Sequence, residues 1–563
     1  MDHEEFTKLS LEEQERVFHQ TPFRERGDMI LHSHDPNYLT RSLSQEELYL
    51  VTREMDLEER SEILRYATLP QLFFVSDIDC WKKDRLDTKH FVGWLETLRE
   101  ADEERLLAWL VEMDYETVVA GFQQLIRVIK PEWEWPSDEL LGDQPYFTLD
   151  EQYFISVSEQ DLETVRRAIE VLYENHRGRY VTILEGILGE LDYEMEEGAY
   201  QKRSLRLSDR GFPDPETAHH IYRPLAEGEF EKSARKEVTH TRFQGEETLS
   251  EPRPPHYLAL WANDRIFLDD VLLLFREGPR EIQESLEEEL AWLSNKIIAC
   301  DGIDFASEER VRHGIERSRR FVSLGLELLS ERKLERARGL LKERWLEIIF
   351  RWSVTRLIEL RERARKIVES YWKGKREPFL EFLEAPYESI FRGLFHKVPL
   401  CYDPKVADDP DQLRDFKDAQ DVDKTRRALD QIDRIHEFLG EGLRNVHLDQ
   451  LTLEPLLATG FARFLVGGKV SFSPLGAKEA AEFLKKAFVT RTSVRLLDPA
   501  AKERFLTRSF SPEDQELLRP LWALVFQRLE DEFSRLDLSR EIDPRFISSL
   551  YLAQPAPSHA SRK

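Results

Sequence analysis

Apolar positions recur at the spacing of an α-helix along most of this chain. One stripe repeats every three or four residues and predicts a buried helix face: Ile282, Leu286, Leu290, Leu293 and Ile297. A second stripe precedes the run from Ser330 to Tyr371, which contains no proline: Val311, Ile315, Val322, Leu326 and Leu329. In the middle of that run, at residues 345–360, apolar side chains fall on nearly every side of a helix. Such a helix must be surrounded by others, so we expect it to be the hub of a helical domain.

Closely spaced helix starts characterise the N-terminal part. Four pairs have the spacing of an N-cap residue and a reciprocal acceptor: Ser10 with Glu13, Ser44 with Glu47, Asp56 with Glu59 and Thr68 with Gln71. Thr21-Pro22 and Asp35-Pro36 add starts with proline at the first helical position. Helices this short cannot stand alone, so we expect them to stack in a solenoid-like array. Longer helices are predicted at 90–99, 103–112 and 116–129.

Few stretches predict strands. The sequence "YFTLDEQYFISV", residues 146–157, reads as a hairpin, and "VGGKVSFSPL", residues 466–475, as a Gly-Gly turn followed by one short strand. The predicted fold is therefore all-α: a multi-domain helical protein with an N-terminal short-helix repeat (solenoid-like) array, a larger helical bundle domain and one or two minor β-hairpins.

Breaks in composition divide the chain into six predicted parts. The Pro-rich and acidic "KPEWEWPSDELLGDQP" marks the first boundary, and the charged, Gly-containing segment 226–256 buries too little to order itself. The parts are a short-helix repeat domain at 1–136, a hairpin plus helices at 137–225, a flexible acidic linker at 226–256, a central helical domain at 257–376, a C-terminal helical domain at 377–552 and a disordered tail at 553–563.

Composition favours a soluble cytoplasmic protein. The 563 residues include 109 Asp plus Glu against 81 Lys plus Arg, a net charge of −28, which disfavours general nucleic-acid binding. The three cysteines are far apart and predict neither a disulfide framework nor a zinc site. The acidic start "MDHEEFTKLS" does not resemble a signal peptide, and no apolar run is long enough to span a membrane.

One segment is basic against this acidic background. Residues 310–376 hold 20 Lys plus Arg and 9 Asp plus Glu, a difference of +11. The candidate partner-binding residues on this basic face are Arg312, Arg317, Arg319 and Arg320. Two interpretations stay open: the basic residues pair with acidic groups of the same chain, or they bind an acidic partner.

Three short stretches contain residue types that could bind a metal or carry thiol chemistry, but a structural role also explains each of them. His32, His34 and Asp35 combine metal-ligand types, but Asp35 fits better as the helix cap before Pro36. The adjacent His219 and His220 cannot bind one metal from one helix face. The cluster Asp77, Asp79, Cys80 and Trp81 combines carboxylates with a thiol, yet closing a helix and anchoring Trp81 explains it better.

Phosphate and cation binding are weakly indicated by two turns. "LVGGKVS" around Lys469 lacks the first glycine and the Ser or Thr of a phosphate-binding loop, so a turn is favoured. The turn "DRGFPDP", residues 209–215, fits a rigid corner better than a cation site. We therefore predict no cofactor and no metal, and we assign no catalytic residue.

Two resemblances add to this picture. The segments "LPQLFFVSDIDCWKKDRLD", "RLSDRGFPDPETAHHIYRPL", "LSNKIIACDGIDF" with "FVSLGLELLS", and "FLVGGKVSFSPL" resemble a family of large bacterial proteins that carries only a domain-of-unknown-function label. This resemblance covers about residues 40–480, implies a shared helical fold and transfers no catalytic residues. The short-helix alternation from Leu43 to Asp87 resembles the helical-repeat N domain of MgtE-type magnesium channels and flagellar motor switch proteins.

The sequence is compatible with three functions. The first is a cytoplasmic helical interaction or scaffold protein that binds a protein partner, because stacked helices offer extended surfaces. The alternative is an enzyme or small-ligand-binding protein with a pocket between the helical domains. The third is magnesium-linked regulation, which rests on the channel-like repeats. The oligomeric state stays open.

Overall fold

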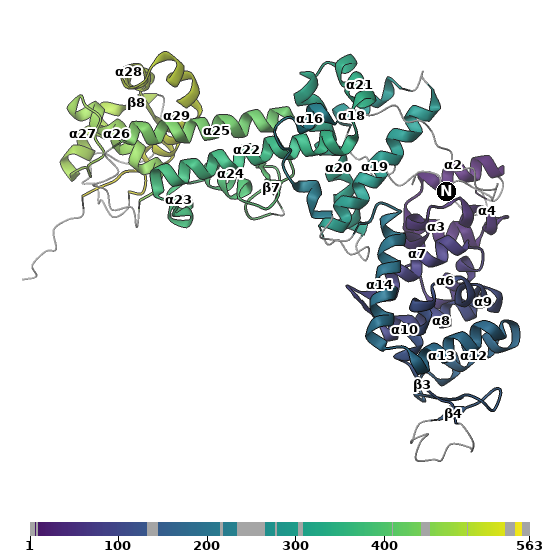
Figure 1. The fold of residues 1–563 in the computed structure, drawn as a ribbon. Helices are drawn as coiled ribbons and strands as arrows, with labels where there is room; N and C mark the ends of the chain where they lie inside the picture. Colours follow the sequence, from purple (N-terminus) through teal and green to yellow (C-terminus); the bar gives the residue numbers. More distant parts are fainter. Residues whose placement is uncertain are drawn as a thin grey trace, which may run out of the picture. The chain divides into compact units, whose positions relative to one another are not determined.

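The structure is a computed structural model that describes residues 6, 9–53, 55–131, 145–213, 218–233, 265–275, 279–301, 308–407, 409–440, 451–491, 494–534 and 547–553. Helices joined by short loops make up most of these residues, with a few short antiparallel strand pairs, so the predicted all-α class is confirmed. The chain divides into two compact units, Met1–Arg351 and Trp352–Lys563 (Figure 1). Nothing tests the finer six-part division, which stays a prediction.

Short capped helices open the first unit. They are α2 (Leu11–Gln20), α3 (Phe23–Leu31), α4 (Pro36–Ser42), α5 (Gln45–Thr52), α6 (Leu57–Leu64) and α7 (Leu69–Asp79). The predicted capping boxes form at Ser10, Ser44 and Thr68, and the carboxylates of Asp35 and Asp56 accept N–H bonds at the starts of α4 and α6. The start at Pro22 is shifted by one residue, because Pro22 is the N-cap residue of α3 and lies outside the helix.

A three-stranded sheet follows α8 (Thr88–Ala101), α9 (Glu103–Glu112) and α10 (Tyr115–Gln123). Its central strand β5 (Phe154–Val157) pairs antiparallel with β4 (Tyr146–Phe147), which confirms the predicted hairpin, and with β3 (Ile126–Ile129). The helix predicted to run through Ile129 is therefore wrong after Gln123. The alternating Ile126 and Val128 side chains are buried by the pairing with β5. A small hairpin, β1 (Trp81–Lys82) with β2 (Arg85–Leu86), was not predicted.

Longer helices complete the first unit. They are α12 (Leu162–Asn175), α13 (Arg177–Gly189), α14 (Asp192–Ser208), α18 (Phe267–Leu273), α19 (Arg280–Cys300), α20 (Glu308–Ser330) and α21 (Leu334–Glu343), with the short η1 (His219–Tyr222) and α16 (Glu229–Lys232). Helix α14 lies against α10, and α19 lies against α20 (Figure 1). The predicted hub is interrupted at Arg344, where the backbone becomes extended between α21 and α22 (Leu346–Trp372).

The second unit contains most of α22 and the helices that follow. These are α23 (Arg376–Phe382), α24 (Tyr387–Leu394), α25 (Ala419–Leu439), α26 (Leu453–Gly467), α27 (Ala477–Ala487), α28 (Pro499–Ser509) and α29 (Pro512–Phe533). Two hairpins join them: β6 (Cys401–Tyr402) with β7 (Leu413–Arg414), and β8 (Phe488–Arg491) with β9 (Val494–Leu497). Helices α22 and α25 run side by side, with Tyr371 donating to Asp433 and Trp372 donating to His436 (Figure 1).

The predicted Gly-Gly turn, the strand after it, the linker and the tail have different outcomes. The Gly-Gly turn is confirmed, since α26 ends at Gly467 and Gly468 takes a left-handed conformation with φ +74°. The strand expected after it is wrong for the described residues there, which form only an isolated bridge between Leu475 and Leu552. Of the predicted linker 226–256, residues 226–233 include α16, and the others lie outside the described residues. Residues 554–563 of the predicted tail also lie outside them.

Candidate functional site

The predicted basic face lies on α20, where its arginines contact carboxylates of the same chain. Arg317 donates to Asp301 at 2.7 Å, Arg319 to Asp269 at 2.5 Å, and Arg320 pairs with Glu316 at 2.9 Å. Arg319 is 8% exposed and Arg312 is half-buried. These ion pairs supply intramolecular partners for Arg317, Arg319 and Arg320. Binding of an external partner on this face stays a prediction.

The Asp77 cluster is structural, as the favoured interpretation predicted. Helix α7 ends at Asp79, and the buried Trp81 ring lies under the Arg203 guanidinium at 5.3 Å. Arg206 on α14 donates two hydrogen bonds to the buried Asp77 carboxylate, at 2.8 and 2.7 Å. Burial raises the pKa of Asp77, and the Arg206 bonds oppose that shift. The arrangement joins α7 to α14, and the other carboxylate of the cluster, Asp79, pairs with Arg60.

Two of the metal-site candidates have local partners. Asp35 caps α4 by accepting from the Tyr38 N–H at 2.9 Å, and His32 contacts the Asp28 carbonyl oxygen at 2.8 Å. Gly211, in the 209–215 turn, has φ +81°, and residues 214–217 of that turn lie outside the described residues. In the part of the chain that the structure describes, no group of three or more His, Cys, Asp or Glu side chains is arranged to hold a metal ion.

An unpredicted pair of nucleophile and base lies between η1 and α19. The Nδ1 atom of His219 is 3.0 Å from the Sγ atom of Cys300, although the two residues are 81 positions apart. We call these two residues the thiol–imidazole pair. His219 is exposed, and Cys300 is 5% exposed at the last position of α19. Proton transfer between a thiol and an imidazole is possible at this separation.

A network beside the thiol–imidazole pair fixes its two elements. Tyr222 of η1 donates to the Asp301 carboxylate at 3.2 Å, and Arg317 of α20 donates to the same oxygen at 2.7 Å. Burial raises the pKa of the Tyr222 hydroxyl well above its ordinary value, so Tyr222 remains a neutral donor. The Arg317 guanidinium also contacts Nε2 of His313 at 3.1 Å. Three elements thus hold His219 against Cys300.

Sequence reasoning considered these residues separately and missed the pair. His219 was examined only with His220, as a metal-ligand candidate, and Cys300 only as an isolated cysteine. The available signal was the resemblance itself, because His219 and Cys300 occur in two of the segments that carry it. Their contact depends on tertiary structure, which neither segment specifies alone.

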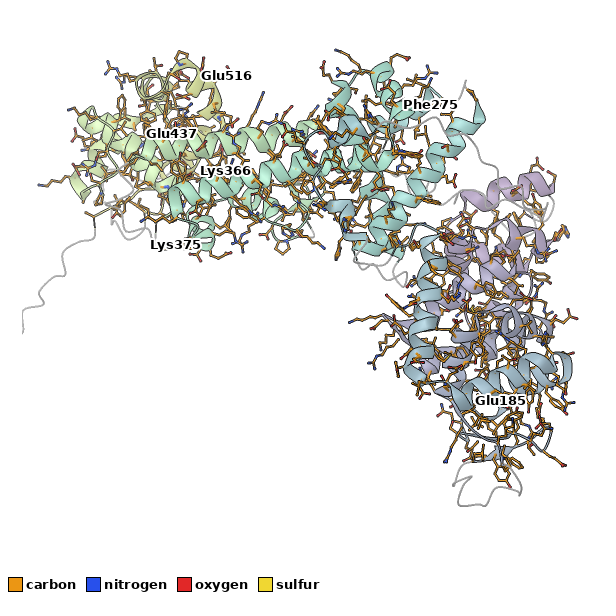
Figure 2. The ribbon with its side chains drawn as sticks, in the orientation of Figure 1. Glu185, Phe275, Lys366, Lys375, Glu437 and Glu516 are labelled. Carbon is orange, nitrogen blue, oxygen red and sulfur yellow. The ribbon has the colours of Figure 1, made fainter. Side chains whose placement is uncertain are left out.

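An exposed apolar and acidic surface lies where α13 meets α14. Leu188, Leu191 and Tyr193 are 39%, 54% and 67% exposed, and the exposed Glu190, Asp192 and Glu194 alternate with them. We call residues 188–194 the α13–α14 corner; Figure 2 labels Glu185 on the neighbouring turn of α13. Glu190 and Asp192 form no ion pair with any residue that the structure describes. Large apolar side chains this exposed and this close together favour a binding surface.

The second unit contains a groove of about 420 Å³ along the C-terminal half of α22. Its lining, here called the α22 groove, consists of Glu362, Arg365, Lys366, Val368, Glu369, Gly374, Arg376 and Phe395. Arg365 pairs with Glu362, and Arg376 pairs with Glu377 while lying over the Phe395 ring. Lys366, labelled in Figure 2, has no carboxylate partner among the described residues. The groove thus combines two apolar side chains, Val368 and Phe395, with Lys366 and with the carboxylates of Glu362 and Glu369.

Comparison with known proteins identifies the family and no characterised relative. A family model described as "Family of unknown function (DUF6178)" matches residues 3–553. No curated protein and no solved structure matches the chain. The likeness to MgtE-type channels and motor switch proteins therefore stays a prediction. None of the helices in the described part of the chain combines the length and apolar character that a membrane span needs. The chain belongs to the DUF6178 family of unknown function.

Proposed function

We propose that the protein is a helical interaction protein whose α13–α14 corner binds a basic amphipathic helix of a partner protein. The observation that carries the proposal is the exposure of Leu188, Leu191 and Tyr193 next to acidic side chains. Apolar side chains at such a surface supply binding energy when a partner covers them, and tyrosine is enriched among the residues that dominate interfaces.

The charges of the corner define the partner. Glu190, Asp192 and Glu194 surround the apolar residues, and the whole chain carries a net charge of −28. An acidic partner would be repelled, whereas Lys and Arg beside an apolar stripe would complement both features. Because these acidic groups are exposed, we expect binding to weaken as salt is added.

A photo-crosslinking amino acid at Tyr193 of the full-length protein tests the proposal in an extract of its source cells. The matched control places the same crosslinker at Leu205, which is 63% exposed on the same helix but outside the corner. We expect one protein to be crosslinked from Tyr193 and not from Leu205, at a segment rich in Lys and Arg. Its capture should be lost in Leu191→Glu and weakened by added salt.

Equal crosslinking from Tyr193 and Leu205, or a crosslinked segment rich in Asp and Glu, would exclude this corner as the binding surface. Charge reversal on α20 is a less informative test, because Arg317→Glu and Arg319→Glu would also break the ion pairs with Asp301 and Asp269.

A second candidate function, binding of a small organic acid, is favoured by the α22 groove. Its volume of about 420 Å³ suits a small ligand, and Lys366 could hold an anionic group while Val368 and Phe395 contact an aromatic body. The fluorescent probe 8-anilinonaphthalene-1-sulfonate has both parts. We expect saturable binding that Lys366→Gln abolishes.

Lys375→Gln is the control for this test, because Lys375 is an exposed lysine close in sequence that does not line the groove (Figure 2). The probe should bind this variant as it binds the wild type. Equal binding to the Lys366 variant and the wild type would exclude the groove as the acid-binding site.

A further inference from the structure

The three cysteines lie in different chemical environments. Burial raises the pKa of the Cys80 thiol well above its ordinary value, and the nearby Asp79 carboxylate adds to the shift. Burial also raises the pKa of Cys401, to about 12, with Asp421 contributing. Both thiols therefore stay protonated and unreactive at neutral pH, because the thiolate is the nucleophilic form. Neither has an imidazole within hydrogen-bond distance among the described residues.

Cys300 differs because a base is in contact with its sulfur. The 3.0 Å separation between Sγ and His219 Nδ1 allows the thiol proton to move to the imidazole. The imidazole is exposed and Cys300 itself is 5% exposed, so we expect a small reagent to reach the sulfur along the His219 ring. This combination of a thiol and an imidazole in contact with its sulfur is absent at Cys80 and Cys401 in the described structure.

The groups around the pair act in opposite directions. Burial of Cys300, the C-terminal end of α19 and the Asp301 carboxylate all disfavour a negative sulfur. Asp301 is compensated by the Arg317 guanidinium and by the Tyr222 hydroxyl, both within 3.2 Å of the same carboxylate oxygen. Nε2 of His313 is 3.1 Å from the Arg317 guanidinium. His219 contacts the sulfur and can offset the unfavourable helix end, so we expect the reactivity of Cys300 to depend on it.

We propose that Cys300 is a reactive thiol that undergoes exchange with low-molecular-weight disulfides, with His219 as its base. The Cys300 Sγ atom attacks one sulfur of the small disulfide, and its proton passes to His219 Nδ1. The disulfide bond of the reagent breaks, a new bond joins Cys300 to one half, and the other half leaves as a thiolate that takes the proton back from His219. One disulfide is consumed and one is formed, so no other oxidant is required.

The test measures modification of the folded full-length protein by 5,5′-dithiobis(2-nitrobenzoate), with the modified cysteine assigned by peptide mass spectrometry. We expect Cys300 to react before Cys80 and Cys401. His219→Gln should slow the reaction at pH 7 about tenfold, which corresponds to a difference of about one pKa unit in the reacting thiol. The matched control is His220→Gln, because His220 is the adjacent exposed histidine and does not contact the sulfur.

Two results would overturn the proposal: modification of Cys80 or Cys401 as fast as Cys300, or equal rates in the His219 and His220 variants. If His219→Gln fails to fold, as judged by circular dichroism, the pH dependence of the wild type decides. A rate at Cys300 that levels off below the pKa of a free thiol supports the pair. A rate that rises through pH 9 as free cysteine does excludes it.

Discussion

Ionisable side chains are buried at several positions, and each is held by a defined neighbour. In the first unit, Arg26 and Glu47 form an ion pair at 3.2 Å with side chains 0% and 1% exposed, and Arg26 also lies 4.4 Å from the Phe23 ring. In the second unit, His436 is 2% exposed and accepts a hydrogen bond from the Trp372 indole at 3.1 Å. Such residues connect stability to pH and tolerate substitution poorly.

His436 should make the protein less stable in mild acid. Burial lowers its pKa from 6.5 to about 4, so the unfolded chain binds a proton that the folded protein does not bind between these values. Above pH 6.5 both states are neutral at this site, and its stabilising contribution is fully present. As the pH falls from 6.5 toward 4, the free energy of unfolding decreases by about 3 kcal/mol. Urea unfolding of the wild type and of His436→Phe at several pH values checks this. The difference in unfolding free energy between the wild type and His436→Phe should change between pH 6.5 and 4. A difference that stays constant would contradict the lowered pKa of His436.

Gly121 should not tolerate alanine. A Cβ atom at Gly121 on α10 would lie 2.3 Å from the ring of Phe91, which is fully buried. We expect Gly121→Ala to lower the unfolding free energy by about 1 to 3 kcal/mol, because the buried ring would have to shift against Trp109 and Phe122. Gly93→Ala on α8 is the control: nothing lies within 4 Å of its added Cβ, so the helix should gain stability. Denaturant unfolding of both variants measures the contrast.

At the scale of elements, buried charges join helices that are far apart in the sequence. Arg206 of α14 holds Asp77 at the end of α7 and also pairs with Asp114, which precedes α10. Asp77 is 2% exposed, and the hydrogen bonds from Arg206 compensate its carboxylate, with the charge of Arg203 adding to them. The Arg203 Nε group donates to the Asp77 carbonyl oxygen at 2.6 Å and strengthens the same junction.

Removing Arg206 should therefore cost far more than removing an exposed arginine. Arg206→Met leaves the Asp77 carboxylate buried without its cation, and we expect a loss of about 3 kcal/mol in unfolding free energy. The control is Arg166→Met, which breaks an exposed pair with Glu170 at 2.7 Å and should cost less than about 1 kcal/mol. Equal losses in the two variants, measured by urea unfolding, would show that the junction is not a major source of stability.

Elements that depend on neighbouring residues could be predicted, and those that depend on distant partners could not. The capping boxes at Ser44 and Thr68 need residues only three positions apart, so their spacing was sufficient. Strand β3 was assigned to a helix because its partner β5 lies about thirty residues further along the chain. The end of α21 at Arg344 was missed because no proline or glycine marks it. The thiol–imidazole pair was missed for the same reason as β3, since 81 positions separate its members.

At the scale of the whole molecule, each unit has an aromatic core of its own. In the second unit, Phe461 contacts the rings of Phe483, Phe505 and Phe526, and all four side chains are buried. In the first unit, Phe91 contacts Trp109 and Phe122. We therefore expect each unit to have its own free energy of unfolding.

Phe461→Ala should weaken the second unit selectively. Truncating a buried phenylalanine removes about 3 to 5 kcal/mol from the unfolding free energy of the core that contains it. We expect differential scanning calorimetry to show one transition at a lower temperature while another keeps the wild-type value, and Phe91→Ala to shift the other one. A shift of the whole profile by either substitution would indicate a single cooperative unit.

The central position of β5 has a consequence for self-association. All four of its residues, Phe154–Val157, are buried, and both of its edges are paired, with β3 on one side and β4 on the other. A short apolar strand rich in β-forming residues is the kind of segment that seeds amyloid when its edges are free. Because β5 lies in the middle of a small sheet, the folded chain presents no free edge of this strand. Any event that detaches β4 would expose an edge of β5 to another copy of the protein.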